Sequence, residues 1–246
     1  MVSPSPTHPA PPEDHRPRVA AERRERTRAR LIASALVVIA QRGLEPGVID
    51  EVITAAGVAR GTFYNYFRTH EALWAGVAEA VSNEIVRVID PLVLLHRDPA
   101  ARLAAGLRYA LRLAKTYPLF ATFVVRGGHA AIRQGGQATQ NVMRDIDAGI
   151  ATGRFAALPA ALILDLVFGS VVAAFATVQS GNAPNDYPEQ FAQALLQALG
   201  VPRAAAQRHA TCALAPIEIP ADSLLAHARR AADTTSTPKP ARPNQK

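Results

Sequence analysis

The segment from Ile49 to Phe67 constrains the fold of this chain more than any other part of the sequence. Its first half repeats apolar side chains at the spacing of one helix face: Ile49, Val52, Ile53 and Ala56. Gly57 then supplies a turn, since glycine adopts the positive φ that side chains resist. A second short helix is expected over Ala59–Phe67. Two short helices joined in this way predict a helix-turn-helix, in which one helix braces the other against the major groove of DNA.

The second helix carries side chains that suit DNA. Arg60 can donate two hydrogen bonds to guanine, which gives about 1–3 kcal/mol of discrimination in favourable cases. Phe63 and Phe67 are interpreted as packing residues. The two tyrosines could belong to the same aromatic core, but their hydroxyls need a polar partner, which favours phosphate contact. Gly61 leaves room for close approach of the backbone. The residues expected to contact DNA here are Arg60, Gly61, Thr62, Tyr64, Asn65 and Tyr66.

A run of arginines precedes this segment, in a chain with 27 basic and 20 acidic residues. Its members are Arg16, Arg18, Arg23, Arg24, Arg26, Arg28 and Arg30. Such a run is often only a solvated helix face. Because this run leads directly into a helix-turn-helix, we favour phosphate contact and take Arg28 as its representative. A polyanionic partner also suits the net charge of +7.

The order of residues across the turn resembles a family signature. Ala56, Gly57 and Val58 are followed by Gly61-Thr62-Phe63-Tyr64, then by Tyr66-Phe67, Glu71 and Leu73. This pattern is similar to that of the tetracycline-repressor (TetR) family of transcriptional regulators, clearly over about Arg23–Val77. The resemblance implies a three-helix DNA-binding head, a long fourth helix and an all-α ligand-binding and dimerisation domain. It also implies a homodimer on a palindromic operator, usually a repressor released by a small molecule.

Two positions depart from the family pattern. Family members often have a Ser or Thr cap before the second helix, where this chain has the stretch Glu45-Pro46-Gly47-Val48. A lysine commonly opens the fourth helix, where this chain has His70. A neutral histidine contributes less to phosphate binding than a lysine, so we expect modest or pH-sensitive affinity. His70 is therefore counted among the expected DNA contacts, and H70K should tighten operator binding in a gel-shift titration.

The rest of the chain is also patterned for helices, and no sustained period-two alternation predicts a strand. Thr69 can cap the fourth helix, which we expect to end before Pro91. Five further helices are expected, with a weaker sixth: about 100–117, 118–126, 139–152, 159–180, 188–199 and 203–212. The predicted domains are a disordered Pro/Arg-rich arm (1–20), the DNA-binding domain (21–70), the ligand-binding and dimerisation domain (71–215) and a C-terminal extension (216–246), mostly disordered from about 233.

The stretch Phe155–Val178 is apolar enough to be mistaken for a membrane span. Asp165 in its middle and Pro159 near its start argue against insertion in a membrane. A helix that is apolar all round is also expected where two subunits bury it from both sides. We therefore predict a dimer in which a four-helix bundle is built from Leu162–Val178 and from Phe191, Leu195, Leu196 and Leu199.

An effector pocket is expected among the helices of residues 100–180. Its candidate wall residues are Tyr109, Phe120, Phe123, Met143, Phe168 and Phe175, although ordinary core packing explains each of them better when it is taken singly. Asp165 is a further candidate, since a carboxyl group on a buried helix must be paired, solvated or protonated.

The sequence argues against an enzyme. It has no glycine-rich phosphate loop, no cluster at metal-ligand spacing and no nucleophile motif, so neither a cofactor nor a metal is expected. Cys212 is the only cysteine, and the N-terminus has no secretory signal, which suits a reducing cytoplasm. The alanine- and arginine-rich composition suggests a bacterial source. Three alternatives stay open: an activator or a regulator controlled by a protein partner, a membrane-associated basic protein, and an enzyme.

Overall fold

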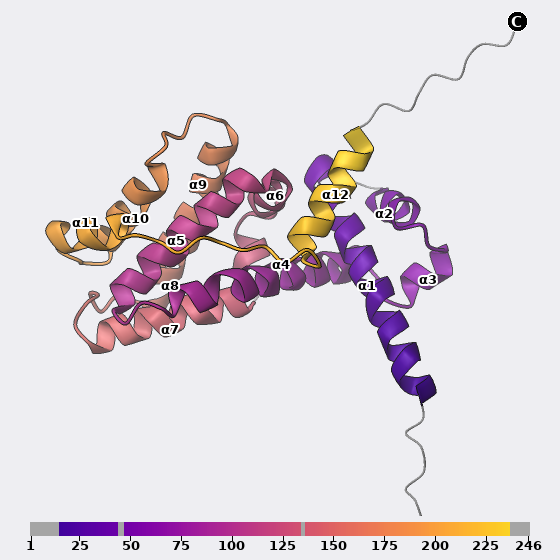
Figure 1. Ribbon diagram of the computed structural model, residues 1–246, viewed down its shortest axis with the longest axis horizontal. Coiled ribbons are helices and arrows are strands. Elements are labelled where there is room, and N and C mark those ends of the chain that lie inside the picture. Colours follow the sequence, from indigo (N-terminus) through magenta and orange to yellow (C-terminus); the bar gives the residue numbers. More distant parts are fainter. Residues whose placement is uncertain (1–14, 44–46, 134–135, 237–246) are drawn as a thin grey trace, which may run out of the picture.

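The computed structural model describes residues 15–43, 47–133 and 136–236, and every regular element in those ranges is helical (Figure 1). In chain order the elements are α1 (His15–Arg42), α2 (Val48–Ala56), α3 (Arg60–Tyr64), α4 (His70–Val93), α5 (Pro99–Thr116), α6 (Pro118–Arg133), α7 (Gln137–Ala151), α8 (Ala160–Leu164), the π-helical turn η1 (Asp165–Gly169), α9 (Ser170–Gln179), α10 (Tyr187–Ala198), α11 (Arg203–Thr211) and α12 (Leu224–Ser236). The all-α prediction is confirmed.

Helices α1, α2 and α3 form the head. The C-terminal half of α1 packs on α2 and α4, and the fully buried Leu36 and Phe63 lie in the shared core. Gly57 ends α2 with φ of 59°, as expected. Gly43 likewise follows α1 with φ of 80°, and its N–H donates to the carbonyl oxygen of Ile39 (2.8 Å). Helix α3 is shorter than predicted, because Asn65 and Tyr66 already form a turn.

Helix α4 connects the head to the rest of the chain, the body. The hydroxyl of Thr69 caps it by accepting from the N–H of Ala72 (3.1 Å), as predicted. The helix does not end before Pro91 but continues to Val93. Proline lacks the N–H that an interior position needs. At Pro91 the bond to the carbonyl oxygen four residues earlier is therefore missing, and α4 continues for only two more residues.

Helix α5 is central to the body, where it contacts α4, α7, α9, α10 and α11. One cluster of buried apolar side chains runs from the head along α4 to α5, α6 and α9. A second cluster joins α5 to α7, α10 and α11, with Ile146 and Leu196 fully buried in it. Because the first cluster is shared, the head and the body have a continuous apolar core.

Helix α8, the η1 turn and α9 follow one another without a break. By length and composition alone, the run Ala160–Gln179 could cross a membrane, yet only 28% of its most apolar window is buried within the chain. Leu162 on α8 is 44% exposed. An apolar run with so little cover in a single chain is the feature expected of a subunit interface.

Three of the leucines expected at that interface lie inside their own chain instead. Leu196 and Leu199 are fully buried and Leu195 is 6% exposed, all within the cluster that joins α10 to α5 and α11. These leucines therefore belong to the core of their own chain. The same amphipathic spacing fits a core helix or an interface helix, and only the position of α5 distinguishes the two.

Both ends of the described chain are more helical than predicted. Helix α1 starts at His15, inside the segment expected to be disordered, because Pro17 lies in its first turn, where proline is tolerated. The prediction for residues 1–14 and 237–246 lies outside the described residues. Helix α12 was not expected from the sequence, and it continues past residue 233, where disorder was predicted, to Ser236.

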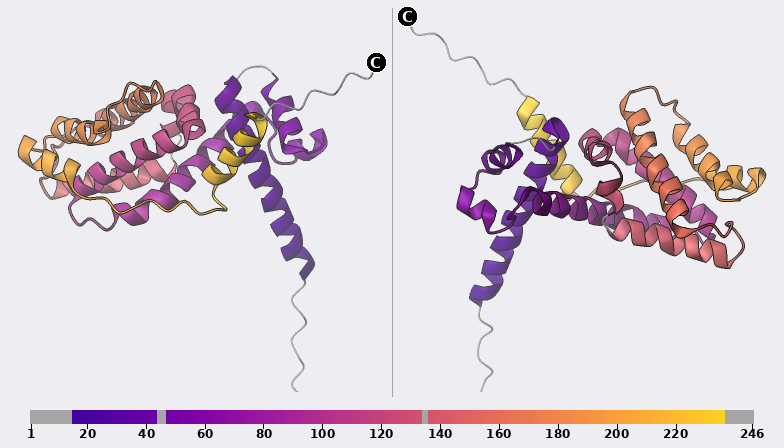
Figure 2. Two further views of the ribbon diagram at one scale, coloured as in Figure 1. Left: turned by 45° about the horizontal axis from the view of Figure 1, so that its top comes forward. Right: turned by 180° about the vertical axis from the view of Figure 1, so that it is seen from behind.

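The chain returns from α11 to the head through an extended segment, and α12 packs mainly on α1 (Figures 1 and 2). Two side chains of α5 hold this segment. The guanidinium of Arg108 donates to the carbonyl oxygen of Cys212 (2.7 Å), and the hydroxyl of Tyr109 donates to that of Ala215 (3.0 Å). Leu225 and Ala228 then bury one face of α12. We call residues 212–236 the C-terminal strap.

Candidate nucleic-acid interface and ligand cavity

Helix α3 presents a polar face to solvent. Its inner face is fixed by Phe63, which is fully buried, and by Phe67 just after it, whose ring lies 6.0 Å from that of Phe63. Tyr64 is 39% exposed, although its ring also meets the edge of Phe63. The division expected between packing phenylalanines and an outward Tyr64 is therefore present in the structure.

Arg60 is exposed at the start of α3 and pairs with Asp50 of α2 (3.1 Å). Both side chains are about two-thirds exposed, at 66% and 62%, so the pair is weak and open to exchange for another anion. A methyl group in place of the Gly61 hydrogen would meet no protein atom within 4 Å beyond its own helix and chain neighbours. Internal packing therefore does not require glycine at position 61. The absence of a side chain there leaves the backbone of α3 open to close approach from outside.

Helix α2 lacks a side-chain cap, as its sequence suggests. Gly47 is the N-cap residue, with φ of 97° and no side-chain hydrogen bond. Its carbonyl oxygen accepts from the N–H groups of Asp50 and Glu51 (3.0 and 3.2 Å). These two carboxylates lie in the first turn, at the positive end of the helix dipole. Their negative charges stabilise that end of the helix and compensate in part for the missing cap.

Helix α1 and the α3 region line a groove. Its walls are Val19, Ala20, Arg23, Arg24 and Thr27 from α1, and Thr62, Asn65 and Tyr66 from the α3 side. The guanidinium of Arg24 lies 5.8 Å from the centre of the Tyr66 ring, within the range of a cation–π contact. Arg28 does not line this groove. It pairs with Glu79 of α4 at 3.8 Å, because its side chain leaves α1 on another face.

His70 is exposed and is the first residue of α4, three residues after Phe67. Its position at a helix N-terminus next to the expected DNA face agrees with the role assigned to it from the sequence, which stays a prediction.

The body encloses a cavity of about 160 Å³. Helices α4, α5, α6, α7 and α9 and the η1 turn all contribute to its wall, which is mostly apolar. The aromatic part consists of Phe120, Phe123, Phe168 and Phe175. The polar part of the wall consists of Asp90, Arg102, Asn141 and Asp145, whereas Ser82 lies about two turns before Asp90 on α4, beside the start of α7.

The polar end is an ion-pair cluster of four side chains from α4, α5 and α7. Asp145, 4% exposed, accepts from Arg144 (3.0 and 3.1 Å) and from Arg102 (3.4 Å). Arg144 also donates to both oxygens of Asp90 (3.0 and 3.3 Å). These bonds with Asp145 and Asp90 raise the pKa of Arg144 above its usual range. Arg144 does not itself line the cavity, but it pairs with both carboxylates that do, so the cluster of two carboxylates and two guanidiniums has no net charge.

Comparison with known proteins matches both parts of the chain. Residues 31–77 match the model of bacterial regulatory proteins of the tetR family, and residues 98–211 match that of the tetracyclin repressor-like C-terminal domain. The structure of RolR in complex with its ligand resorcinol is 32% identical in sequence and has a TM-score of 0.65, over 80% of this chain and all of RolR. The chain belongs to the TetR family of transcriptional regulators.

Other relatives agree with this assignment. An HTH-type transcriptional regulator of Bacillus subtilis, YvdT, is 38% identical over 70 residues, which are 28% of this chain and only 34% of YvdT. A TetR-family regulator from Marinobacter aquaeolei has the same fold at 17% identity, with a TM-score of 0.61, over 73% of this chain and 98% of its own. The predicted class, a non-enzymatic DNA-binding regulator with a C-terminal ligand-binding domain, is confirmed.

The expected ligand residues of this TetR regulator divide into two groups. Phe120, Phe123 and Phe168 line the cavity. Tyr109, Met143 and Asp165 do not, which corrects their expected place in its wall. Tyr109 faces away from the cavity to hold the C-terminal strap, and Met143 packs against the cluster between α5 and α10.

Asp165 lies exposed in the η1 turn of the same regulator, on the run that also carries Leu162. The four charged residues at the polar end, conversely, were not predicted from the sequence. A signal was present in Arg144-Asp145, two adjacent charges within an amphipathic helix. Nothing in the sequence, however, shows that Asp90 and Arg102 would face them.

Proposed function

We propose that this TetR regulator is a repressor that binds a palindromic operator as a homodimer and leaves it when a small molecule fills the cavity. The exposed faces of α3 and of the groove beside it support the DNA-binding part. The poorly covered apolar run Ala160–Gln179 supports the dimer, since two such runs would bury each other. Its site of action would be the cytoplasm, where operator DNA lies.

The cavity indicates the class of effector. An apolar cavity of about 150 Å³ accepts one benzene molecule, so the 160 Å³ found here suits a single aromatic ring. Its polar end has donors and acceptors but no net charge, which favours neutral hydroxyl groups over a carboxylate. We therefore propose a neutral, hydroxylated one-ring aromatic effector. The ligand named for RolR, resorcinol, belongs to this class.

Helix α4 gives the effector a direct mechanical connection to the head. Ser82, Asp90 and several apolar residues of α4 line the cavity, and the same helix begins at His70, three residues after Phe67. A ligand that bonds to the polar end therefore pulls on a helix whose other end carries the head. The coupling free energy between effector and operator would arise from a head spacing that no longer matches successive major grooves.

The observation that carries this proposal is the neutral ion-pair cluster at one end of an aromatic cavity. The full chain is first used to select bound duplexes from a random pool, and the selected duplex is then titrated with the protein by gel shift. Resorcinol and phenol should release the duplex, whereas benzoate, equal in ring size but anionic, should do so poorly. Failure to enrich any palindrome would refute the repressor proposal, and release by benzoate alone would refute the effector class.

A further inference from the structure

The C-terminal strap lies outside the parts of the chain that define its family. Both matched segments, 31–77 and 98–211, end before residue 212, so the family assignment does not explain why residues 212–236 cross the molecule. Figures 1 and 2 show the strap running from α11 along the body to the head. In addition to α4, it is therefore a bridge from the far end of the body to the head.

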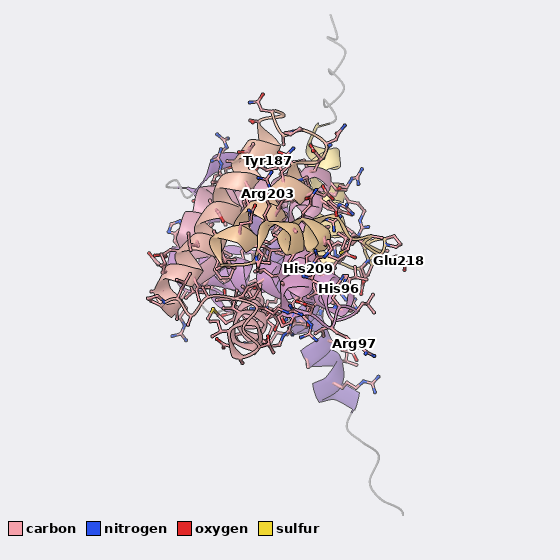
Figure 3. The ribbon with its side chains drawn as sticks, turned by 90° about the vertical axis from the view of Figure 1, so that its left-hand side faces the viewer. His96, Arg97, Tyr187, Arg203, His209 and Glu218 are labelled. Atoms are coloured by element: carbon pink, nitrogen blue, oxygen red, sulfur yellow. The ribbon has the colours of Figure 1, made fainter. Side chains whose placement is uncertain are left out.

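Two buried side chains of α5 fix the start of the strap. Arg108 and Tyr109 are 4% and 1% exposed, and they donate hydrogen bonds to two carbonyl oxygens of the strap at 2.7 and 3.0 Å. Ile217 and Ile219 then pack against the apolar core, whereas Glu218 between them is exposed and projects outward in Figure 3. This alternation is typical of an extended segment with one face on the protein, so the strap is held along its length.

The end of the strap, α12, is docked where the head meets the body. It contacts α1 of the head, the connecting helix α4 and α6 of the body. Leu225 and Ala228 bury its inner face. The hydroxyl of the buried Ser223 caps the helix by accepting from the N–H of Ala226 (2.9 Å). Because an isolated helix of 13 residues is marginal in water, α12 depends on this docking.

Helix α5 has the effector cavity on one side and the strap on the other. Gly106 and Ala110 line the cavity, whereas Arg108 and Tyr109 between them hold the strap. A ligand that moves α4 relative to α5 also moves the head relative to the point where the strap is fixed. Such a movement has to stretch the strap or undock α12. The docked strap therefore favours one position of the head and opposes its displacement.

We propose that the strap is a brace that holds the head in its operator-binding position, so that the effector acts against it. This inference rests on the proposed function, in which the effector releases the operator by moving the head. A ligand shifts an equilibrium between two positions only by its difference in affinity for them. Docking of α12 stabilises the operator-binding position, and the strap therefore sets how much effector is needed to release the DNA.

The test compares L225D, which undocks α12, with the matched variant H227D. Leu225 is buried and His227 is exposed on the same helix, and each substitution adds one carboxylate to α12. Operator affinity is measured by gel shift with the selected duplex, and resorcinol affinity by calorimetry without DNA. Thermal unfolding confirms that each full-length variant folds. Y109F, which keeps the ring but removes one bond to the strap, is a second and milder variant.

In L225D the operator affinity should fall and the resorcinol affinity should rise. The ratio of the resorcinol affinity to the operator affinity reports the equilibrium of the head, because each ligand selects one position. This ratio should rise by at least about fivefold, the lower end of typical coupling between two sites, and should not change in H227D. Y109F should raise it by about twofold. A variant that only destabilised the fold would weaken both affinities together.

A distance between head and body tests the brace without DNA. Spin labels are attached at A55C on α2 and Q207C on α11, two exposed positions, in a C212S background. The labelled chain is diluted with unlabelled chain, so that each dimer carries one pair of labels. Pulsed electron paramagnetic resonance should show a broader or displaced distance distribution in L225D than in H227D. Resorcinol should displace the wild-type distance in the same direction as L225D does.

A ratio that stays the same or falls in L225D, or equal distance distributions in L225D and H227D, would overturn the brace while operator binding by wild type stands. A wild type that enriches no duplex would refute the proposed repressor function instead. The distance distributions would then decide the brace alone, since they need neither an operator nor an effector.

Discussion

The substitution D145N tests how the polar end of the cavity sets both stability and effector choice. Asp145 is 4% exposed and accepts three hydrogen bonds from Arg102 and Arg144. Asparagine has the same shape but no charge, so Arg144 would keep Asp90 as its anionic partner, whereas Arg102 would lose the carboxylate with which it pairs. Removing one partner of a buried ion pair costs about 3–5 kcal/mol. Because side chains of Arg102 and Arg144 are 24% and 37% exposed, water replaces part of the loss, and we expect about 2–3 kcal/mol.

For a chain of this size each kcal/mol corresponds to about 2–4 °C in Tm, so D145N should unfold about 4–12 °C below wild type. The net charge at the polar end also changes from zero to +1. The preference for resorcinol over benzoate, measured by calorimetric titration, should therefore shift toward benzoate by at least about tenfold, or 1.4 kcal/mol. The matched control is D147N, the same change on an exposed position of α7. If D145N and D147N have equal Tm values and equal ligand preferences, the electrostatic reasoning is wrong.

Three further substitutions probe other parts of the molecule. In G149A the new Cβ would overlap the ring of Phe155, and overpacking of about 1–3 kcal/mol should lower Tm in calorimetry; an unchanged Tm would contradict this packing. D50N frees Arg60 from its exposed partner and removes a negative charge beside the DNA. Operator affinity in gel shifts should therefore rise by up to about fivefold per head. A decrease in affinity would refute the assignment of this face of α3 to DNA. Burial would raise the pKa of Glu189, but hydrogen bonds from two arginines lower this pKa below 4.5. The stabilisation by the ionised Glu189 is therefore present above about pH 4.5 and is lost as pH falls through the pKa of the folded state. E189Q should have a lower Tm than wild type at pH 7 and a smaller further loss of Tm in acid, and parallel pH profiles for the two proteins would count against this ion pair.

The head could be predicted well from the sequence because its determinants are local. Gly57 sets the turn, Phe63 and Phe67 define the packed face of α3, and Gly47 leaves α2 without a side-chain cap, all within one short segment. The apolar wall of the cavity could be predicted in part, because buried aromatic side chains in the body were few enough to single out. Local spacing was sufficient in both cases.

Features that depend on distant packing could not be predicted. Asp90 and Arg144 are 54 positions apart, and their hydrogen bonds follow from the way α7 packs on α4. Tyr109 has the composition of a pocket residue, yet it faces the C-terminal strap because α5 has the cavity on one side and the strap on the other. Arg28 differs from Arg23 only in its angle around α1, and that angle decides whether it meets Glu79 or the groove.

The strap has a practical consequence for any experiment that extends or labels this chain. It begins directly after α11, remote from the head, crosses α5 and ends with α12 against α1, so the described chain ends at Ser236, the last residue of a helix that packs on the head (Figure 1). A bulky fusion after this residue would be tethered near the operator and could compete with DNA for space. A small fluorophore at the same place would instead be a proximity reporter, quenched or brightened by a labelled duplex as it is bound and released.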